Sequence, residues 1–252
     1  MTTKHILSAT LLACLTAGSA QATLLSDLFN GGSMTAGDKQ FDQWTLGHFD
    51  SSDGRIFDAS TIDVTALADG GLDPGPGLRF SVLGNALAVT GDGVYAFADL
   101  AFGFRVSVTD PSHKIKGNSL NYSVGGATHQ WIPDDSYDLG TYVHENVGTA
   151  AGLADLATED IEFSRLLTPP DTLESSTIKV SDAASFAPQS SLWVSKNILV
   201  WAVDTTDTVN LTGFEQRFAQ TTSSVPEPAS LALTALALGG LALSRRQRRT
   251  GR

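Results

Sequence analysis

Short runs that alternate between hydrophobic and polar residues recur through most of the chain, from residue 23 to residue 224. The alternation is clear in Leu78–Val82 and in Leu100–Val108, where bulky residues take every second position. A period of two places those residues on one face of a β-strand and Arg, Gly and Ser on the other. Helical periodicity is weak, and only Ala150–Leu156 suits a short helix or a loop. The pattern therefore predicts a protein built mainly of β-strands.

Eleven strands are predicted between turns rich in Gly, Asp, Asn and Ser. They cover Phe41–Leu46, Thr61–Leu67, Leu78–Leu83, Ala86–Thr90, Tyr95–Val108, Ser119–Val124, Thr141–Val147, Ile161–Leu166, Thr177–Val180, Leu192–Val203 and Thr208–Ala219. That many strands in about 200 residues favours two packed antiparallel sheets. We expect one all-β domain over residues 23–219, an antiparallel two-sheet sandwich that is jelly-roll-like, with a β-barrel as the second choice. Gly91-Asp92-Gly93, between two apolar runs, predicts a hairpin loop.

The first 22 residues have the pattern of a signal peptide that exports the chain. Lys4 gives a positive start, residues 6–17 are apolar, and Ala20 and Ala22 form an Ala-x-Ala exit. The apolar run is shorter than the roughly 20 residues that a spanning helix needs. We therefore expect signal peptidase to cut after Ala22. A lipoprotein signal ending at Cys14 is the alternative, but it shortens the apolar run and leaves the Ala-x-Ala exit unused.

The C-terminus combines a proline box, an apolar run and an arginine cluster, in that order. These are Val225, Pro226, Glu227 and Pro228, then the uncharged residues 229–243, then Arg245, Arg246, Arg248 and Arg249. A transmembrane helix over this apolar run would rise about 22 Å, against roughly 30 Å of hydrocarbon, so it is a marginal anchor. The arginines should stay in the cytoplasm, which places the domain outside. Gln220–Ser224, rich in Thr and Ser, predicts a flexible stalk between domain and membrane.

The three-part end resembles the PEP-CTERM sorting signal of Gram-negative bacteria that make exopolysaccharide. The resemblance covers residues 225–249 and rests on all three parts in their order. It implies recognition by an exosortase, a membrane-embedded cysteine transpeptidase that removes the tail. The protein would begin as an inner-membrane-anchored precursor and end at the cell surface or outside the cell. A plain tail anchor that is never cut is the alternative, but such an anchor needs no Pro-Glu-Pro.

The stretch between the two signals also resembles the ectodomain of some PEP-CTERM proteins. The shared segments are Ser33–Phe41, Ile62–Val64, Gly77–Phe80, Asp99–Phe102, Val194–Ile198 and Phe214–Phe218. This resemblance implies an architecture and no chemistry.

Charge and cysteine content narrow the classes of partner. Residues 23–224 hold ten Lys and Arg against 26 Asp and Glu, a net charge of about −16 that should repel nucleic acid and anionic lipid. The single cysteine lies inside the signal peptide, so the processed domain has no disulfide and no cysteine metal site. Such an acidic domain should attract divalent cations or basic partners rather than nucleic acid or anionic lipid.

No catalytic motif stands out in the sequence. His48, His113, His129 and His144 have none of the spacings of a metal motif. No nucleophile elbow, phosphate-binding glycine loop or dinucleotide fingerprint is present. Carboxylate pairs for glycoside hydrolysis come from positions far apart in a chain, so the sequence does not single one out.

Calcium is the strongest chemical hypothesis, because this ion prefers several oxygen ligands on a loop. Three acidic, loop-like clusters provide them: Asp50 with Asp53, Asp69 with Asp73, and Asp134, Asp135 and Asp138. None has the EF-hand spacing, and Asp and Gly are also ordinary turn residues. No other cofactor is expected.

Aromatic residues suggest contact with sugars. Trp131, with Tyr137 and Tyr142 nearby, lies in a polar, loop-rich stretch and is the tryptophan we expect to be exposed. Trp193 and Trp201 fall in predicted strands, where core packing is the default.

Two functions of different class follow. The first is a non-enzymatic protein of the exopolysaccharide matrix, acting in structure, adhesion or glycan contact. The second is an exported hydrolase that acts on polysaccharide from a jelly-roll scaffold. A groove holding two carboxylates with perturbed pKa values would favour the hydrolase, and a smooth sandwich would favour the matrix protein.

Overall fold

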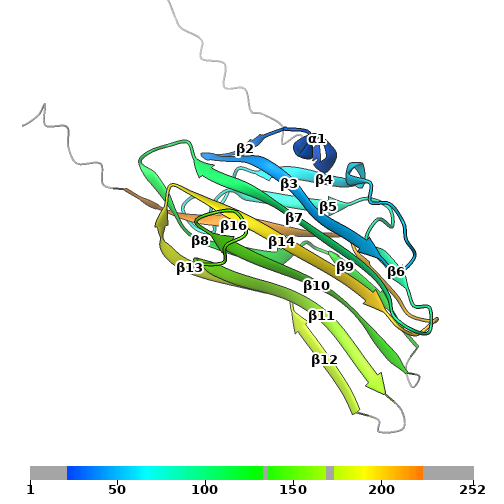
Figure 1. Cartoon of the computed structure of the whole chain (residues 1–252). Helices are drawn as coiled ribbons and strands as arrows, with labels where there is room; N and C mark the ends of the chain where they lie inside the picture. The colour runs from blue at the N-terminus through cyan, green and yellow to red at the C-terminus, as the bar shows by residue number, and fades with distance from the viewer. Residues whose placement is uncertain (1–21, 133–135, 169–172, 224–252) are drawn as a thin grey trace, which may run out of the picture.

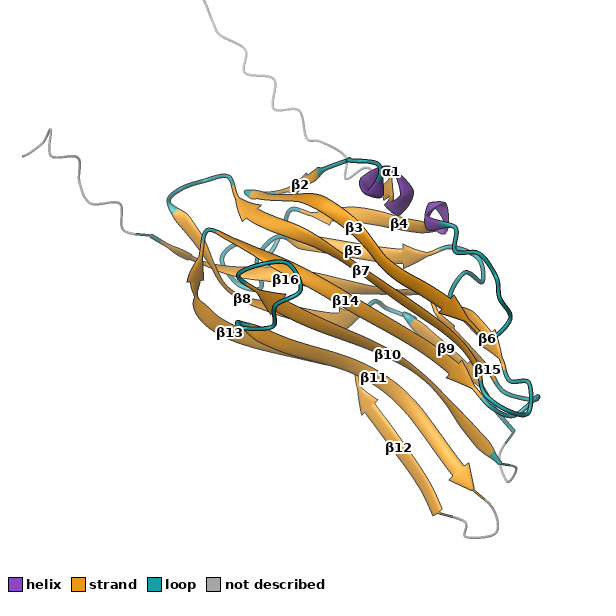
Figure 2. Ribbon diagram, viewed as in Figure 1, coloured by secondary structure: helices purple, strands orange, loops and turns teal. Residues whose placement is uncertain are grey.

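The computed structural model describes residues 22–132, 136–168 and 173–223. Two large antiparallel sheets face each other across a hydrophobic core, and a third, smaller sheet lies near one end (Figure 1, Figure 2). Each of the eleven predicted strands overlaps a strand of the structure. The mainly antiparallel β architecture is thus confirmed.

The strands divide among three sheets. The seven-stranded sheet has the order β12 (Leu173–Lys179), β11 (Ala157–Thr168), β10 (Tyr137–Gly148), β14 (Ser191–Ala202), β7 (Ala96–Val108), β3 (Lys39–Ser51) and β2 (Met34–Ala36). The six-stranded sheet has the order β1 (Thr23–Leu24), β4 (Ile62–Leu67), β5 (Gly77–Val82), β16 (Gly213–Thr222), β8 (His113–Tyr122) and β13 (Ser181–Gln189). The small sheet has the order β6 (Ala88–Thr90), β15 (Thr208–Leu211) and β9 (Ala127–Gln130). Within the described residues, the helical elements are α1 (Leu25–Phe29) and the 3₁₀ turn η1 (Ala59–Thr61).

Aromatic side chains from both large sheets fill the centre of the core. Phe104 of β7 contacts Phe41 and stacks on Trp44, with ring centroids 4.4 Å apart. Phe80 of β5 stacks on Phe214 of β16 at 4.7 Å. Phe80 and Phe104 occupy the alternating positions that the sequence pattern marks as one face of each strand, and a register shift in β3 between Asp42 and Thr45 turns both Phe41 and Trp44 inward. Removing them from water supplies the main driving force for joining the two sheets.

The small sheet corrects two expectations. We predicted two sheets, but β6, β15 and β9 pair only with one another and pack against β10 and β14. They cover the inner face of those long strands where the six-stranded sheet does not. The predicted hairpin at Gly91-Asp92-Gly93 is also wrong, because β6 and β7 belong to different sheets. Gly91 and Gly93 donate backbone hydrogen bonds to Asp207 and Val203 instead.

His129 of β9 should make the stability of the domain depend on pH. Its ring stacks on Phe163, with centroids 3.5 Å apart, and burial lowers its pKa to about 4, with Arg165 adding to the effect. The unfolded chain takes up this proton near pH 6.5, so stability should fall as pH drops from 6.5 towards 4. We expect wild type to lose about 2 kcal/mol more than His129→Gln between pH 7 and 4.5, measured by urea unfolding.

The exposed residue Val94 provides the control for this titration. Val94→Ala keeps every titratable group, so its stability should fall with acid in parallel with that of wild type. If His129→Gln also followed wild type over the whole range, the buried neutral imidazole would be excluded.

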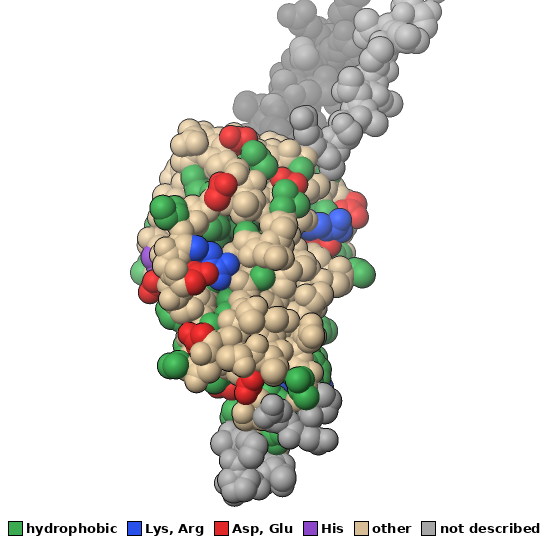
Figure 3. Space-filling model, turned by 90° about the vertical axis from the view of Figure 1, so that its right-hand side faces the viewer, with side chains coloured by type: hydrophobic (Ala, Val, Ile, Leu, Met, Phe, Trp, Pro, Cys, Tyr) green, Lys and Arg blue, Asp and Glu red, His purple; other side chains and the backbone are tan. Residues whose placement is uncertain are grey.

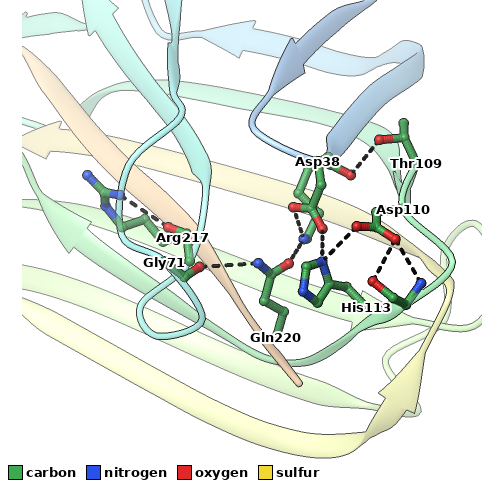
Figure 4. Close-up of polar contacts among 10 residues, drawn as sticks. Asp38, Gly71, Thr109, Asp110, His113, Arg217 and Gln220 are labelled. Atoms are coloured by element: carbon green, nitrogen blue, oxygen red, sulfur yellow. Dashed lines mark hydrogen bonds and ion pairs between the residues drawn. The ribbon is translucent and has the colours of Figure 1, made fainter. Parts of the chain in front are cut away.

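The structure corrects the predicted stalk at residues 220–224. Strand β16 continues to Thr222, and Gln220 is buried. Figure 4 shows its side chain between two segments: the amide donates to the carbonyl of Gly71 at 3.2 Å and accepts from the buried ammonium of Lys39. Asp38 pairs with that ammonium and with His113. Hydroxyl-rich composition favours a flexible stalk only where neighbouring strands do not provide pairing partners, and here β8 does.

Candidate functional site

A shallow groove runs across the outer face of the seven-stranded sheet, which lies in front in Figure 1. Its volume is about 410 Å³. Small residues of β3, β7 and β14 form its floor: Gly47, Ala101, Gly103 and Ser195. Because these positions carry little or no side chain, the sheet surface is lowered there relative to its neighbours.

Backbone packing favours glycine at two floor positions. A Cβ atom at Gly103 would lie 2.9 Å from the carbonyl oxygen of Val194, and one at Gly47 would lie 3.1 Å from that of Ala101. Strand β3 also carries two register shifts here, one between Asp42 and Thr45 and one across Gly47, between Leu46 and His48. Gln43, at one of them, has a φ of 54°, an unusual value for a residue with a side chain. The local backbone is therefore shaped around the groove.

An aromatic wall and a charged pair border the groove at one end. Trp193 of β14 is half-buried and lines the groove with Ala151 and Gly152. Its cross-strand neighbour on β7 is Arg105. The Arg105 guanidinium binds both carboxylate oxygens of Asp42 on β3, each at 2.9 Å. Such a two-point ion pair holds the guanidinium in a fixed plane beside the tryptophan.

A row of polar side chains continues across the same face of the sheet. His48 of β3 contacts Asp99 of β7 at 3.3 Å, and Asn197 of β14 donates to Asp99 at 2.7 Å. Asn197 lies opposite His144 of β10, whose Nδ1 is 2.6 Å from Asp160 of β11. The groove thus adjoins a strip of amide, imidazole and carboxylate groups that crosses five strands.

His144 and Asp160 do not form the basis of a nucleophilic triad. Tyr142 donates to Asp160 at 2.6 Å, and burial near this carboxylate raises the tyrosine pKa. Burial alone would raise the pKa of Asp160, but hydrogen bonds from Tyr142 and His144 lower it. The other imidazole nitrogen, Nε2, faces the side-chain oxygen of Asn146 at 3.1 Å. The nitrogen that would activate a hydroxyl is thus occupied by an amide.

Two carboxyl groups with raised pKa values lie inside the core, away from the groove. Glu145 of β10 and Glu159 of β11 are cross-strand partners and are fully buried. Burial raises the pKa of Glu145, and burial together with the Glu145 charge raises that of Glu159 to about 9. Both point between the sheets, where solvent and a polymer do not reach them.

The acidic residues predicted for calcium contact protein groups wherever the structure describes them. Among residues 22–132, 136–168 and 173–223, no three His, Cys, Asp or Glu side chains lie together as a metal site would need. The acidic residues bind protein groups instead: Asp50 accepts from the backbone of Ser51, Asp53 pairs with Arg55, Asp69 with Arg217 and Asp73 with Lys116, and Asp138 accepts from Trp201. Asp134 and Asp135 lie outside the described residues, and calcium stays a prediction at all three clusters.

Trp131, the predicted glycan contact, is half-buried against the core. The guanidinium of Arg165 lies 4.6 Å above its ring, and Tyr137 packs beside it at 6.3 Å. One ring face is therefore covered by a cation. Tyr142, which we grouped with Trp131, instead belongs to the polar strip beside the groove.

Both terminal signals fall mainly outside the described residues. These are Ala20 of the cleavage site, and Val225, Pro226, Glu227, Pro228 and the arginines of the sorting segment. Ala22 is exposed, and β1 begins directly after it, so cleavage there would leave the first strand whole. Among residues 22–223, apart from 133–135 and 169–172, no helix is long and apolar enough to cross a membrane.

Sequence reasoning missed most groove residues, although one signal was available. Gly103 lies between two bulky residues of an alternating strand, on the opposite face from them, and Gly47 directly follows the predicted strand Phe41–Leu46. Glycine within a strand often marks a close approach of backbone or ligand. Two such glycines on adjacent strands indicate a lowered surface once the pairing of β3 with β7 is known.

Comparison with known proteins identifies the C-terminal segment. Residues 224–249 match the family model of the PEP-CTERM protein-sorting motif. No curated protein matches the chain. Among solved structures, a meso-active thermostable cellulase derived from Cel12A of Rhodothermus marinus aligns over 71% of this chain and 99% of its own, with 7% identity and a TM-score of 0.19. That likeness is too slight to bear on fold or function.

Proposed function

We propose that this chain, an exported exosortase substrate carrying a PEP-CTERM sorting motif, is a non-enzymatic envelope protein that contacts polysaccharide through the groove on its seven-stranded sheet. The sorting motif implies a membrane-anchored precursor. After processing, the domain acts at the cell surface or in the extracellular exopolysaccharide. We expect the fold of this domain to be jelly-roll-like.

The chemistry of the groove supports glycan contact. A sugar ring offers an apolar face of C–H groups and a rim of hydroxyls. Within the groove, Trp193 supplies a flat apolar surface with one polar edge. In the adjoining strip, Asn197 and Asp99 supply a donor and acceptors for hydroxyls. The groove is open and crosses several strands, which suits a polymer better than a small enclosed ligand. The net charge of the domain favours neutral over anionic polysaccharide.

The position of the carboxyl groups favours binding over hydrolysis. Glycoside hydrolysis needs two carboxyl groups on either side of the scissile bond, one of them protonated at working pH. The carboxyls with raised pKa values, Glu145 and Glu159, are buried in the core. The groove is present, so the sandwich is not smooth, but among the described residues these acids do not line it.

Trp193 is the residue whose loss should weaken glycan binding most. We expect Trp193→Ala to bind the exopolysaccharide of the producing cells about tenfold more weakly, because the stacking surface is removed. Affinity electrophoresis of the exported protein through gels containing that polysaccharide measures the retardation.

Trp131→Ala is the matched control, since Trp131 is the tryptophan that the sequence alone suggested. It should retain wild-type retardation. If Trp131→Ala lost binding and Trp193→Ala kept it, the groove would be the wrong site. Release of reducing sugar by the wild-type protein would favour the hydrolase.

A further inference from the structure

Five polar side chains from both large sheets meet in the middle of the core. They are Asn118 of β8, Glu145 of β10, Glu159 of β11, Lys196 of β14 and Gln216 of β16. The side chains of Lys196 and Glu145 are fully buried, and Asn118 is 3% exposed. Burying a group this polar in an apolar core costs stability unless every member is hydrogen-bonded. A cluster of this kind therefore suggests a role beyond packing.

One carboxylate holds an amine and an amide side by side. The Lys196 ammonium donates to Oε2 of Glu145, and the Asn118 amide nitrogen donates to Oε1 of the same carboxylate. The same amide nitrogen also lies 3.0 Å from Oε2 of Glu159. The amine and the amide are thus held by the two oxygens of Glu145, and a second carboxyl contacts the amide nitrogen.

We propose that Lys196 and Asn118 react to form an intramolecular isopeptide bond that joins the two sheets, with Glu145 and Glu159 as the catalytic acid–base pair. The bond forms between Nζ of Lys196 and Cγ of Asn118. The bond between Cγ and Nδ2 of Asn118 breaks, and Nδ2 leaves as ammonia.

The protons balance within the cluster. Glu145 takes a proton from the Lys196 ammonium, which frees the electron pair of the amine. Glu159 gives its proton to the departing Nδ2 and takes one back from the new amide nitrogen. The buried ion pair becomes a neutral amide and a neutral carboxyl group, and no oxidant or cofactor is needed.

The surroundings suit both carboxyl groups to these roles. Burial raises the pKa of Glu145, so it can accept a proton, and the pKa of Glu159 near 9 keeps that carboxyl protonated at neutral pH. The rings of Phe214 and Phe80 lie 5.1 and 5.8 Å from Nζ of Lys196 and keep water away. Fixing amine and amide on one carboxylate holds the two reacting groups in a set orientation, which lowers the entropy cost of bringing them together.

Two unpaired acceptor atoms in the cluster support the proposal that its side chains react further. Within the described part of the chain, Oδ1 of Asn118 and Oε1 of Glu159 are buried and accept no hydrogen bond. Such orphaned oxygens are rare in finished cores. In the linked form, a protonated carboxyl group is available to donate to the amide oxygen.

Peptide mapping of the exported full-length protein tests the bond. After unfolding and trypsin digestion, we expect peptide 117–165 joined to peptide 180–217, with a mass lower than their sum by one ammonia. Trypsin should fail to cut after Lys196. Separate peptides 117–165, 180–196 and 197–217 from folded protein would overturn the proposal, and so would ammonia loss confined to 117–165, which indicates a succinimide.

Variants separate the reaction from mere packing. Glu159→Gln should yield unlinked peptides while the protein still unfolds cooperatively. Asn118→Asp should form the same bond by losing water instead of ammonia. Asn121→Asp, on the same strand, should stay linked as wild type does. A link in wild type that persists fully in Glu159→Gln would overturn the assigned role of Glu159.

Discussion

Replacing Pro226 and Pro228 by alanine is expected to leave the chain uncut in the membrane fraction of cells that make an exosortase. The PEP-CTERM sorting motif covers both prolines. Proline lacks a backbone N–H and disfavours helix, so the box should stay extended outside the predicted membrane helix. Alanine lets that helix continue outward and hides the segment from the enzyme. Immunoblots of membrane, periplasmic and extracellular fractions, made with antibodies to the domain, measure the outcome.

Thr250→Ala, one residue beyond the motif, should be processed and released like wild type. Unchanged processing of the double proline variant would contradict recognition through the box. Cells that lack the exosortase should retain wild type as full-length, membrane-bound protein, which distinguishes enzymatic processing from general proteolysis.

Phe104→Ala is expected to have the largest effect on folding among single core substitutions. The ring contacts Phe41, Trp44 and Phe80, and it is fully buried. Losing such a ring costs about 3–5 kcal/mol, because apolar contacts vanish and a cavity remains. A domain is typically stable by about 5–15 kcal/mol, so the variant should unfold at much lower urea concentration.

Val94→Ala is the surface control, because Val94 is 80% exposed. Its free energy of unfolding should stay within about 0.5 kcal/mol of the wild-type value. If Phe104→Ala unfolded at the wild-type midpoint, the aromatic cluster would not be the centre of the core.

Alternation predicted the strands well where bulky residues mark every second position. In β5, Leu78, Phe80 and Val82 are buried, while Arg79 is exposed. Alternation does not report which strand pairs with which, so the small sheet and the true partners of β6 were missed. Strand β13 was also missed, because its small and polar residues leave no bulky face. Its pairing with β8 depends on tertiary context rather than on local pattern.

The functional residues were harder to predict for the same reason. Glu145 and Lys196 are 51 positions apart in the chain and meet only because β10 and β14 are neighbours. A lysine or glutamate in a strand is ordinarily assigned to the surface, since charged residues are seldom fully buried. The sorting motif, in contrast, is linear, so its residues could be identified without any pairing.

Strand β16 lies inside the six-stranded sheet, between β5 and β8, and it ends two residues before the sorting motif begins. Any tension transmitted to the domain through its C-terminal segment therefore enters along an internal strand. Hydrogen bonds on both sides of that strand must shear together before it can slide out, whereas an edge strand peels away one bond at a time. The attachment point is thus mechanically resistant.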